Sequence, residues 1–243
     1  MVPHPQLPAV PTPVASPPPP RRPAPSSKAD IVAIDSSTGG PNALSNLFSR
    51  LPPNLPVPIV IVQDMPAVFT KHLVEQLTSE SKLTVHEASD GERLGSGSAW
   101  IAHGDYHMTL SHLLAAVHVE LNQGPPENSC RPSVDVLFHS VNEIYRNLVL
   151  AVMLTGVGED GLAGAKALHA SASAILAQDE ASSVVWGMAG AVSRAGIVSA
   201  QMPPSTWQRR SCASRGPDGR EHPEGRFRLC PPPGQGSGRG GYR

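Results

Sequence analysis

A short apolar run that leads into a turn of serine, threonine and glycine constrains this chain more than any other stretch. Residues 31–34 are apolar and have the length of a buried strand, and residues 35–40 read Asp-Ser-Ser-Thr-Gly-Gly. Pro41 follows, and proline suits the first turn of a helix, where a missing N–H breaks no hydrogen bond. The pattern therefore predicts a strand that enters a helix through a sharp turn.

Ser37 lies in this turn, where its hydroxyl group is held clear of the sheet. The free N–H groups at the start of a helix can face a developing negative charge. The stretch is similar to a nucleophile elbow in which Asp35 replaces the first glycine. A turn of this composition also serves simply as a helix cap, so the turn alone leaves both interpretations open.

Apolar strand patterns and amphipathic helix patterns alternate along most of the chain, which predicts a parallel sheet with helices on both faces. The expected strands are 31–34, 59–62, 148–154, 174–177 and 197–199, and the expected helices are 42–50, 68–77, 134–145, 162–168 and 188–194. The middle section departs from this alternation: after a short strand at 83–87, the segments 99–102, 108–110 and 116–121 suggest short antiparallel strands. The predicted fold class is α/β, a doubly wound and mostly parallel sheet with a small antiparallel addition in the middle section.

Composition divides the chain into three parts. Residues 1–28 are rich in proline and favour an extended, disordered segment. Residues 29–202 carry the periodic patterns of one globular domain. Residues 203–243 are polar and rich in glycine, proline and arginine, which predicts a disordered tail.

Charge and cysteine content exclude several classes of function. The net charge of -1 gives no general attraction to nucleic acid or to an anionic membrane. The three cysteines are widely spaced, which indicates neither a disulfide framework nor a zinc site and fits a cytoplasmic location. No apolar run approaches the length of a membrane span, so we expect neither nucleic-acid binding nor membrane insertion.

Three polar residues follow three of the predicted buried strands: Ser37, Asp64 and Asp160. Ligands of an open parallel sheet bind beyond the carboxyl ends of its strands, so these positions can converge although they are distant in sequence. A serine nucleophile needs a base, and the base needs an orienting carboxylate. Ser37 suits the first of these roles and Asp160 the third. Glycines in the loop 156–161 allow its backbone N–H groups to help hold an oxyanion.

The motifs of residues 29–200, taken in order, resemble the catalytic domain of the CheB-type chemotaxis protein-glutamate methylesterases. The serine motif of that family, Ile-Gly-Ala-Ser-Thr-Gly-Gly, corresponds to residues 34–40, and its Gln-His-Met motif corresponds to residues 63–65. Further matching segments are 90–93, 104–108, 131–141, 154–161, 178–182 and 187–188. So many motifs in one order make a chance match untenable.

The resemblance implies hydrolysis of glutamate methyl esters on the signalling helices of chemoreceptors, with glutamine deamidation as a second reaction. It places the nucleophile at Ser37 and the aspartate at Asp160, with the backbone near Val157 beside the oxyanion. It implies no metal or organic cofactor, names methyl-accepting chemotaxis receptors as partners, and leaves a separate response regulator open as a further partner. A typical member also carries an N-terminal receiver domain, whereas only the proline-rich segment precedes the matching region here, so we expect phosphorylation control within the chain to be missing.

Asp64 stands where the family has its catalytic histidine. A carboxylate has an ordinary pKa of about 3.9, against about 6.5 for histidine, and it cannot donate an N–H to Asp160 while it takes the proton of Ser37. We therefore predict impaired activity. His103, His107 and His139 are alternative bases, and a noncatalytic receptor-binding module that keeps the esterase fold is the alternative function.

Overall fold

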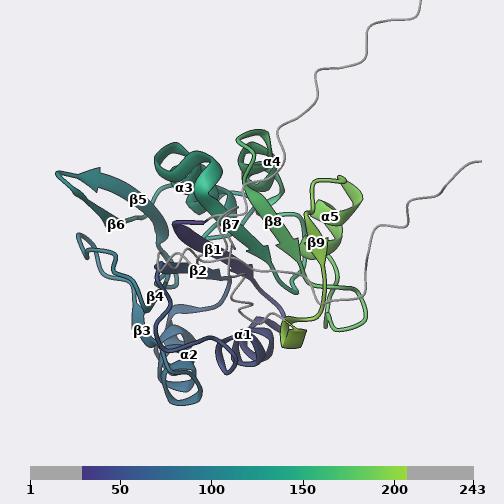
Figure 1. The fold of residues 1–243 in the computed structure, drawn as a ribbon, viewed down its shortest axis with the longest axis horizontal. Coiled ribbons are helices and arrows are strands. Elements are labelled where there is room, and N and C mark those ends of the chain that lie inside the picture. The colour runs from purple at the N-terminus through teal and green to yellow at the C-terminus, as the bar shows by residue number, and fades with distance from the viewer. Residues whose placement is uncertain (1–28, 207–243) are drawn as a thin grey trace, which may run out of the picture.

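Seven strands form one parallel sheet in the order β3-β4-β2-β1-β7-β8-β9 (Figure 1). The computed structural model describes residues 29–206, so the predicted segment 1–28 and most of the predicted tail lie outside the described residues. The strands of this sheet are β1 (Ile31–Ser36), β2 (Ile59–Gln63), β3 (Thr84–Glu87), β4 (Ser98–Ile101), β7 (Val149–Met153), β8 (Ala174–Ala177) and β9 (Ala200–Gln201). The helices are α1 (Gly40–Phe48), α2 (Ala67–Glu80), α3 (Val134–Tyr145), α4 (Leu162–Ala170), α5 (Met188–Arg194) and the 3-10 turns η1 (Arg146–Leu148) and η2 (Pro204–Thr206).

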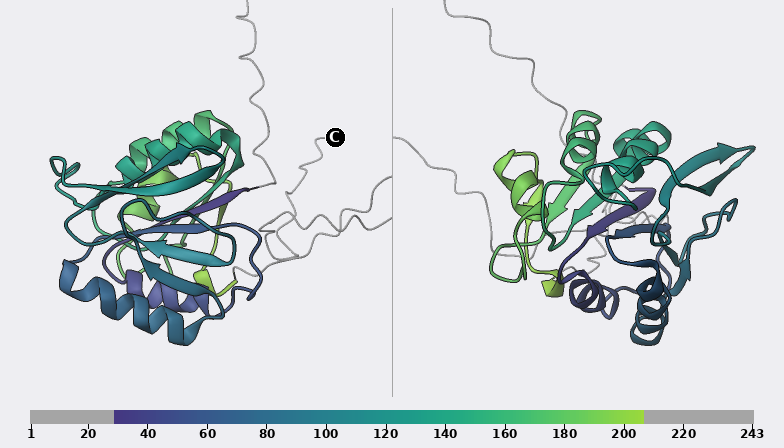
Figure 2. Two further views of the ribbon diagram at one scale, coloured as in Figure 1. Left: turned by 90° about the vertical axis from the view of Figure 1, so that its left-hand side faces the viewer. Right: turned by 180° about the vertical axis from the view of Figure 1, so that it is seen from behind.

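Helices cover both faces of the sheet, and each face has its own core (Figure 2). Successive residues of β1 point to opposite faces: Ile31 and Ala33 pack with α3, α4 and α5, whereas Val32 and Ile34 pack with α1 and α2. Because β1 is buried on both sides, its sequence is a continuous apolar run rather than an alternating one. The predicted α/β class is confirmed.

The middle section differs from the prediction in one respect. Residues 99–102 were expected to pair antiparallel, but β4 pairs parallel with both β2 and β3 and extends the main sheet. Among the strands of the described residues, only β5 (His107–Leu113) and β6 (Ala116–Asn122) pair antiparallel, and they form a separate two-stranded hairpin. Periodicity within a short apolar segment indicates a strand but carries no information about its partner, which explains the error.

The end of the domain also departs from the predicted boundaries. The strand expected at 197–199 is wrong: Ile197 is buried, but the ladder with β8 begins only at Ala200. Beyond residue 202, η2 packs against α1, and its Pro204 is buried. Within residues 29–206, no helix combines the length and the hydropathy that crossing a membrane requires.

Candidate functional site

The turn after β1 is fixed from both neighbouring strands. On one side, the N–H of Ser37 donates to the carbonyl of Thr155, just beyond β7, at 3.1 Å. On the other side, the N–H of Asp64 donates to the carbonyl of Ser36 at 3.0 Å. Gly39 then adopts a φ of 82°, which is strained for residues other than glycine, and α1 begins at the next residue. The predicted passage from strand through a sharp turn into a helix is present.

Ser37 and Asp64 lie side by side at this edge of the sheet. The hydroxyl of Ser37 donates to Oδ2 of Asp64 at 3.5 Å, which is long for an O–H···O hydrogen bond. Ser37 is 8% exposed, whereas Asp64 faces solvent. Desolvation of the Asp64 carboxyl group raises its pKa, the charge of Asp160 raises it further, and the hydrogen bond from Ser37 opposes both effects. A raised pKa makes this carboxylate a stronger base than an ordinary aspartate.

Gln63 joins the two turns that carry these side chains. Its amide nitrogen donates to the carbonyls of Ser37 and Asp64 at 2.9 and 3.0 Å, and its amide oxygen accepts the hydroxyl of Ser36 at 2.8 Å. Every polar atom of this buried side chain therefore has a partner. A β-carbon on Gly40 would collide with the amide of Gln63, so a glycine is required where α1 starts.

Asp160 lies beside this pair but binds the start of a helix that is not its own. Its Oδ2 accepts the N–H of Val134 at 2.7 Å, and its Oδ1 accepts the hydroxyl of Ser133 and the amide of Asn128 at 2.8 and 2.9 Å. The carboxylate thus compensates the positive end of α3, although it precedes α4. No hydrogen bond joins Asp160 to Asp64 in the described chain, and the two interact through charge alone.

The loop after β7 closes the other side of Ser37. The N–H of Gly156 donates to the carbonyl of Val185 at 3.0 Å. The carbonyl of Gly156 accepts the N–H groups of Gly187 and Met188, both at 3.1 Å. A β-carbon on Gly156 would lie 3.0 Å from that of Ser37, so this loop approaches the serine as closely as a glycine permits. Val157 follows this glycine in the chain and is 60% exposed, so it lies at the surface.

None of the three alternative histidines contacts Ser37 within residues 29–206. His107 is buried, and both of its ring nitrogens have backbone partners, at 3.0 and 3.2 Å. His103 lies 3.8 Å from the carboxylate of Glu87, and His139 is exposed on α3. The only hydrogen-bond acceptor that the described residues offer to the hydroxyl of Ser37 is Asp64.

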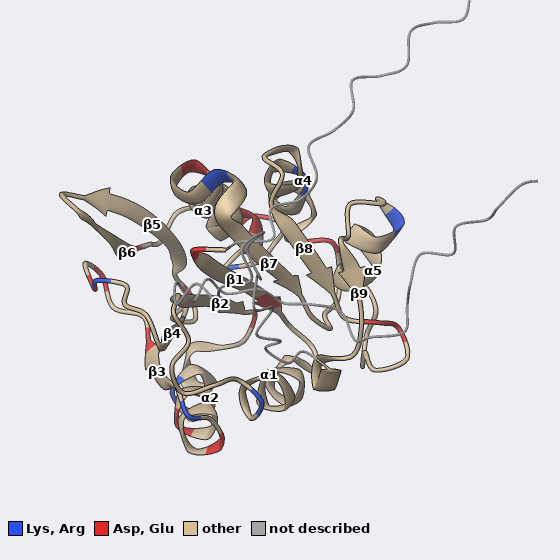
Figure 3. Cartoon of the chain, viewed as in Figure 1, with Lys and Arg blue, Asp and Glu red and all other residues tan. Residues whose placement is uncertain are grey.

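A third carboxyl group, that of Asp35, lies beneath the site. Asp35 is the penultimate residue of β1, is fully buried, and has no hydrogen-bond partner for either oxygen among the described residues. Burial raises its pKa well above the ordinary value, and the charges of Asp160, Asp135 and Asp64 raise it further. Figure 3 shows acidic segments in red on several loops and strand ends, including some near the central strands. Asp35 is therefore protonated under conditions in which an exposed aspartate is ionised.

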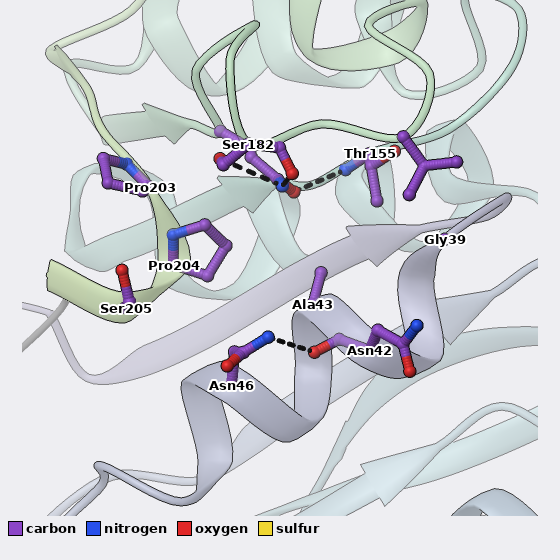
Figure 4. Close-up of a pocket in the computed structure, with 11 residues that line it drawn as sticks. Gly39, Asn42, Ala43, Asn46, Thr155, Ser182, Pro203, Pro204 and Ser205 are labelled. Carbon is purple, nitrogen blue, oxygen red and sulfur yellow. Dashed lines mark hydrogen bonds between the residues drawn. The ribbon is translucent and has the colours of Figure 1, made fainter.

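A separate cavity of about 200 Å³ lies beside Gly39 (Figure 4). Its wall is formed by α1, by the loop after β8 and by η2, with Asn46 of α1 across from Pro204. The lining contains none of the residues Ser37, Asp64 and Asp160. No group of three or more His, Cys, Asp or Glu side chains within residues 29–206 is arranged to hold a metal ion.

A three-layer α/β fold with a serine and two carboxylates at the carboxyl edge of its sheet defines the class of this protein. Residues 32–210 match the family model described as CheB methylesterase. The chain is 51% identical over 176 residues to a protein-glutamate methylesterase/protein-glutamine glutaminase of Trichodesmium erythraeum. The aligned residues are 72% of this chain and 50% of that protein. A protein of the same name from Maricaulis maris is 51% identical over 186 residues, which are 76% of this chain and 46% of its own.

A solved structure leads to the same family. The crystal structure of the Thermotoga maritima CheB methylesterase catalytic domain superposes with a TM-score of 0.72 and 40% identity, covering 73% of this chain and 94% of that one. The chain belongs to the CheB methylesterase family. It spans about half the length of the curated relatives that it matches.

Several residues that build the site were not among the sequence candidates. Gln63 holds the turns together, Ser133 and Asn128 bind Asp160, and Thr155 accepts the N–H of Ser37. Gln63 and Thr155 directly follow apolar strand patterns in the sequence, and that position is the signal by which they could have been found. Asn128 carries no such signal, because it lies in the loop before α3 and follows no apolar strand pattern.

Proposed function

We propose that this protein hydrolyses glutamate methyl esters on the signalling helices of chemoreceptors, with Ser37 as the nucleophile. The hydrogen bond from the hydroxyl of Ser37 to Asp64 carries this proposal, because it points a serine on a tight strand-to-helix turn at a basic group. The names of the relatives give the substrate class, including glutamine deamidation as a second reaction. The partners are accordingly methyl-accepting chemotaxis receptors.

In the proposed reaction, Ser37 attacks the ester carbonyl and Asp64 takes its proton. Methanol leaves with a proton returned from Asp64, and water then hydrolyses the acyl-serine. Asp160 holds the start of α3 in place and keeps a negative charge next to Asp64, which makes Asp64 more basic. The N–H of Val157 and the positive end of α1 are suited to the developing oxyanion.

The same geometry predicts slow turnover. Loss of the base of a serine triad costs a factor on the order of 10⁶, while binding and the oxyanion site leave about 10³ to 10⁴ over water. Asp64 is weaker than a histidine and meets Ser37 over a long 3.5 Å. We therefore expect hydrolysis by this protein to be faster than with no base beside Ser37 and slower than in relatives that have a histidine at this position.

Hydrolysis of methylated receptor by the full chain tests the proposal. Ester hydrolysis that is lost in Ser37→Ala supports it, with Ser49→Ala as the control at an exposed serine that follows α1. The second candidate function is a noncatalytic module that binds receptor helices. It is favoured because no histidine within residues 29–206 hydrogen-bonds to the hydroxyl of Ser37. Receptor binding without any hydrolysis in the wild type would establish that module and refute the esterase.

A further inference from the structure

Asp35 differs from its acidic neighbours because neither oxygen of its carboxyl group has a hydrogen-bond partner among the described residues. The carboxylate of Asp160 accepts several hydrogen bonds at the start of α3, and that of Asp135 accepts the N–H of Gly164 and the amide of Asn128, at 2.9 Å in the latter case. Among residues 29–206, no group donates a hydrogen bond to Asp35, and its side chain has no exposed surface there. An ionised carboxylate in such a position is strongly disfavoured, whereas a neutral carboxyl group can be accommodated.

The position of Asp35 couples its charge to the serine. It lies near the end of β1, two residues before Ser37 in the turn that follows, and its carbonyl accepts the N–H of Leu154 at 2.9 Å. By strand alternation its side chain points to the face that α3 covers, together with Ala33. A charge at this point would add negative potential beneath the reacting hydroxyl and would disturb the strand end that carries it.

We propose that Asp35 is a positioning residue for Ser37: its carboxyl group has to stay neutral while the serine reacts, and loss of its proton switches the serine off. The inference rests on Ser37 being the reactive group of the proposed function. The groups that face Asp35 are Asp160 from the loop before α4, Asp135 from α3, Asp64 after β2 and the thiol of Cys130 from the loop before α3.

These neighbours make the proton of Asp35 depend on the whole site. Three of them are carboxylates, and each one that ionises holds the proton on Asp35 more firmly. Cys130 remains a neutral thiol, because burial and the nearby carboxylates raise its pKa to about 11. Reactivity of Ser37 therefore requires Asp64 to be ionised and Asp35 to be protonated, which gives a bell-shaped dependence on pH.

The reactivity of Ser37 toward a fluorophosphonate tests the inference without any receptor. The Oγ–P bond forms as the P–F bond breaks, fluoride leaves, and the serine proton passes to Asp64 or to water. Intact mass gives the labelling rate of the full chain as a function of pH, with Ser37→Ala as the blank. We expect the wild-type rate to fall by roughly tenfold or more on the alkaline side, which is the effect of one nearby charge.

Asp35→Asn keeps the shape of the side chain but cannot ionise, so its rate should not fall in that range. Asp35→Ala serves the same purpose if the asparagine variant does not fold, as judged by circular dichroism. Asp30→Asn is the matched control, because Asp30 is exposed just before β1, at the opposite end of that strand, and it should keep the wild-type profile.

Three results would overturn the inference: a wild-type rate that never falls with rising pH, profiles of wild type and Asp35→Asn that coincide, or no labelling of Ser37 in either protein at any pH. The outcome is separable from the proposed function. If receptor esters are not hydrolysed but labelling shows the difference between wild type and Asp35→Asn, the esterase proposal fails and the role of Asp35 stands.

Discussion

Asp160 accepts the backbone N–H of Val134 at 2.7 Å and thereby joins the loop before α4 to the first turn of α3. The Ser133 side chain makes no cap hydrogen bond to its own helix and donates to the same carboxylate at 2.8 Å instead. Asp160, which the sequence suggests as an orienting carboxylate, therefore also holds the loop before α4 against the start of α3. Its two roles can be separated by experiment.

Replacement of Asp160 by alanine should lower the free energy of unfolding by about 1–3 kcal/mol, because buried donors at the start of α3 lose their acceptor. Urea denaturation measures this loss. Glu159→Ala is the control, because the side chain of Glu159 is exposed and its removal should change the free energy of unfolding little. Equal stabilities of the two variants would show that water satisfies the freed donors.

Replacement of Asp64 by histidine should raise ester hydrolysis by about 10²-fold or more, which is the usual contribution of a well-placed general base. The imidazole is longer than the carboxylate side chain and can bridge from Ser37 toward Asp160. Initial rates on methylated receptor give the comparison. Asp64→Asn, which cannot take a proton, should be no faster than the parent, and an Asp64→His protein that folds without any gain would refute the role of position 64.

Replacement of Gly156 by alanine should slow hydrolysis, because the new β-carbon would lie 3.0 Å from that of Ser37 and would collide with the sulfur of Met188. Overpacking of this kind costs about 1–3 kcal/mol of stability. Steady-state rates together with thermal unfolding separate the two effects. Gly95→Ala, whose β-carbon would have its nearest neighbour at 4.0 Å in Trp100, should behave as wild type.

The stability of the wild type should decrease relative to Asp35→Asn as pH rises. The folded pKa of Asp35 is raised above the unfolded value of about 3.9, so folding takes up a proton between these two values. The free energy of unfolding therefore falls across this window and is unaffected by Asp35 below it. Urea denaturation at a series of pH values should give diverging curves for the two proteins, and parallel curves would contradict a neutral buried Asp35.

Local sequence patterns were sufficient for elements whose boundaries are set by local chemistry. Residues 134–145 and 188–194 form helices as predicted, and 174–177 forms the predicted strand. The pairing of β4 was predicted wrongly because it depends on β2, which lies far away in the chain.

The candidate site shows the same division between local and distant information. The convergence of Ser37 and Asp64 follows from the rule for strand ends and agrees with the hydrogen bond between them. The roles assigned to Ser37, Asp64 and Asp160 in catalysis stay predictions. The isolation of Asp35 could not be foreseen, because it depends on what α3 and the loop before α4 leave unfilled around it.

The backbone of Ser37 is held on two sides, because its N–H donates to Thr155 and its carbonyl accepts the amide of Gln63. The main chain therefore has little freedom to move at this point. The hydroxyl can rotate about its own side-chain bond, but the backbone beneath cannot follow an approaching molecule. Any change of shape on binding must therefore come from the substrate, so a flexible ester should bind more readily than a rigid one.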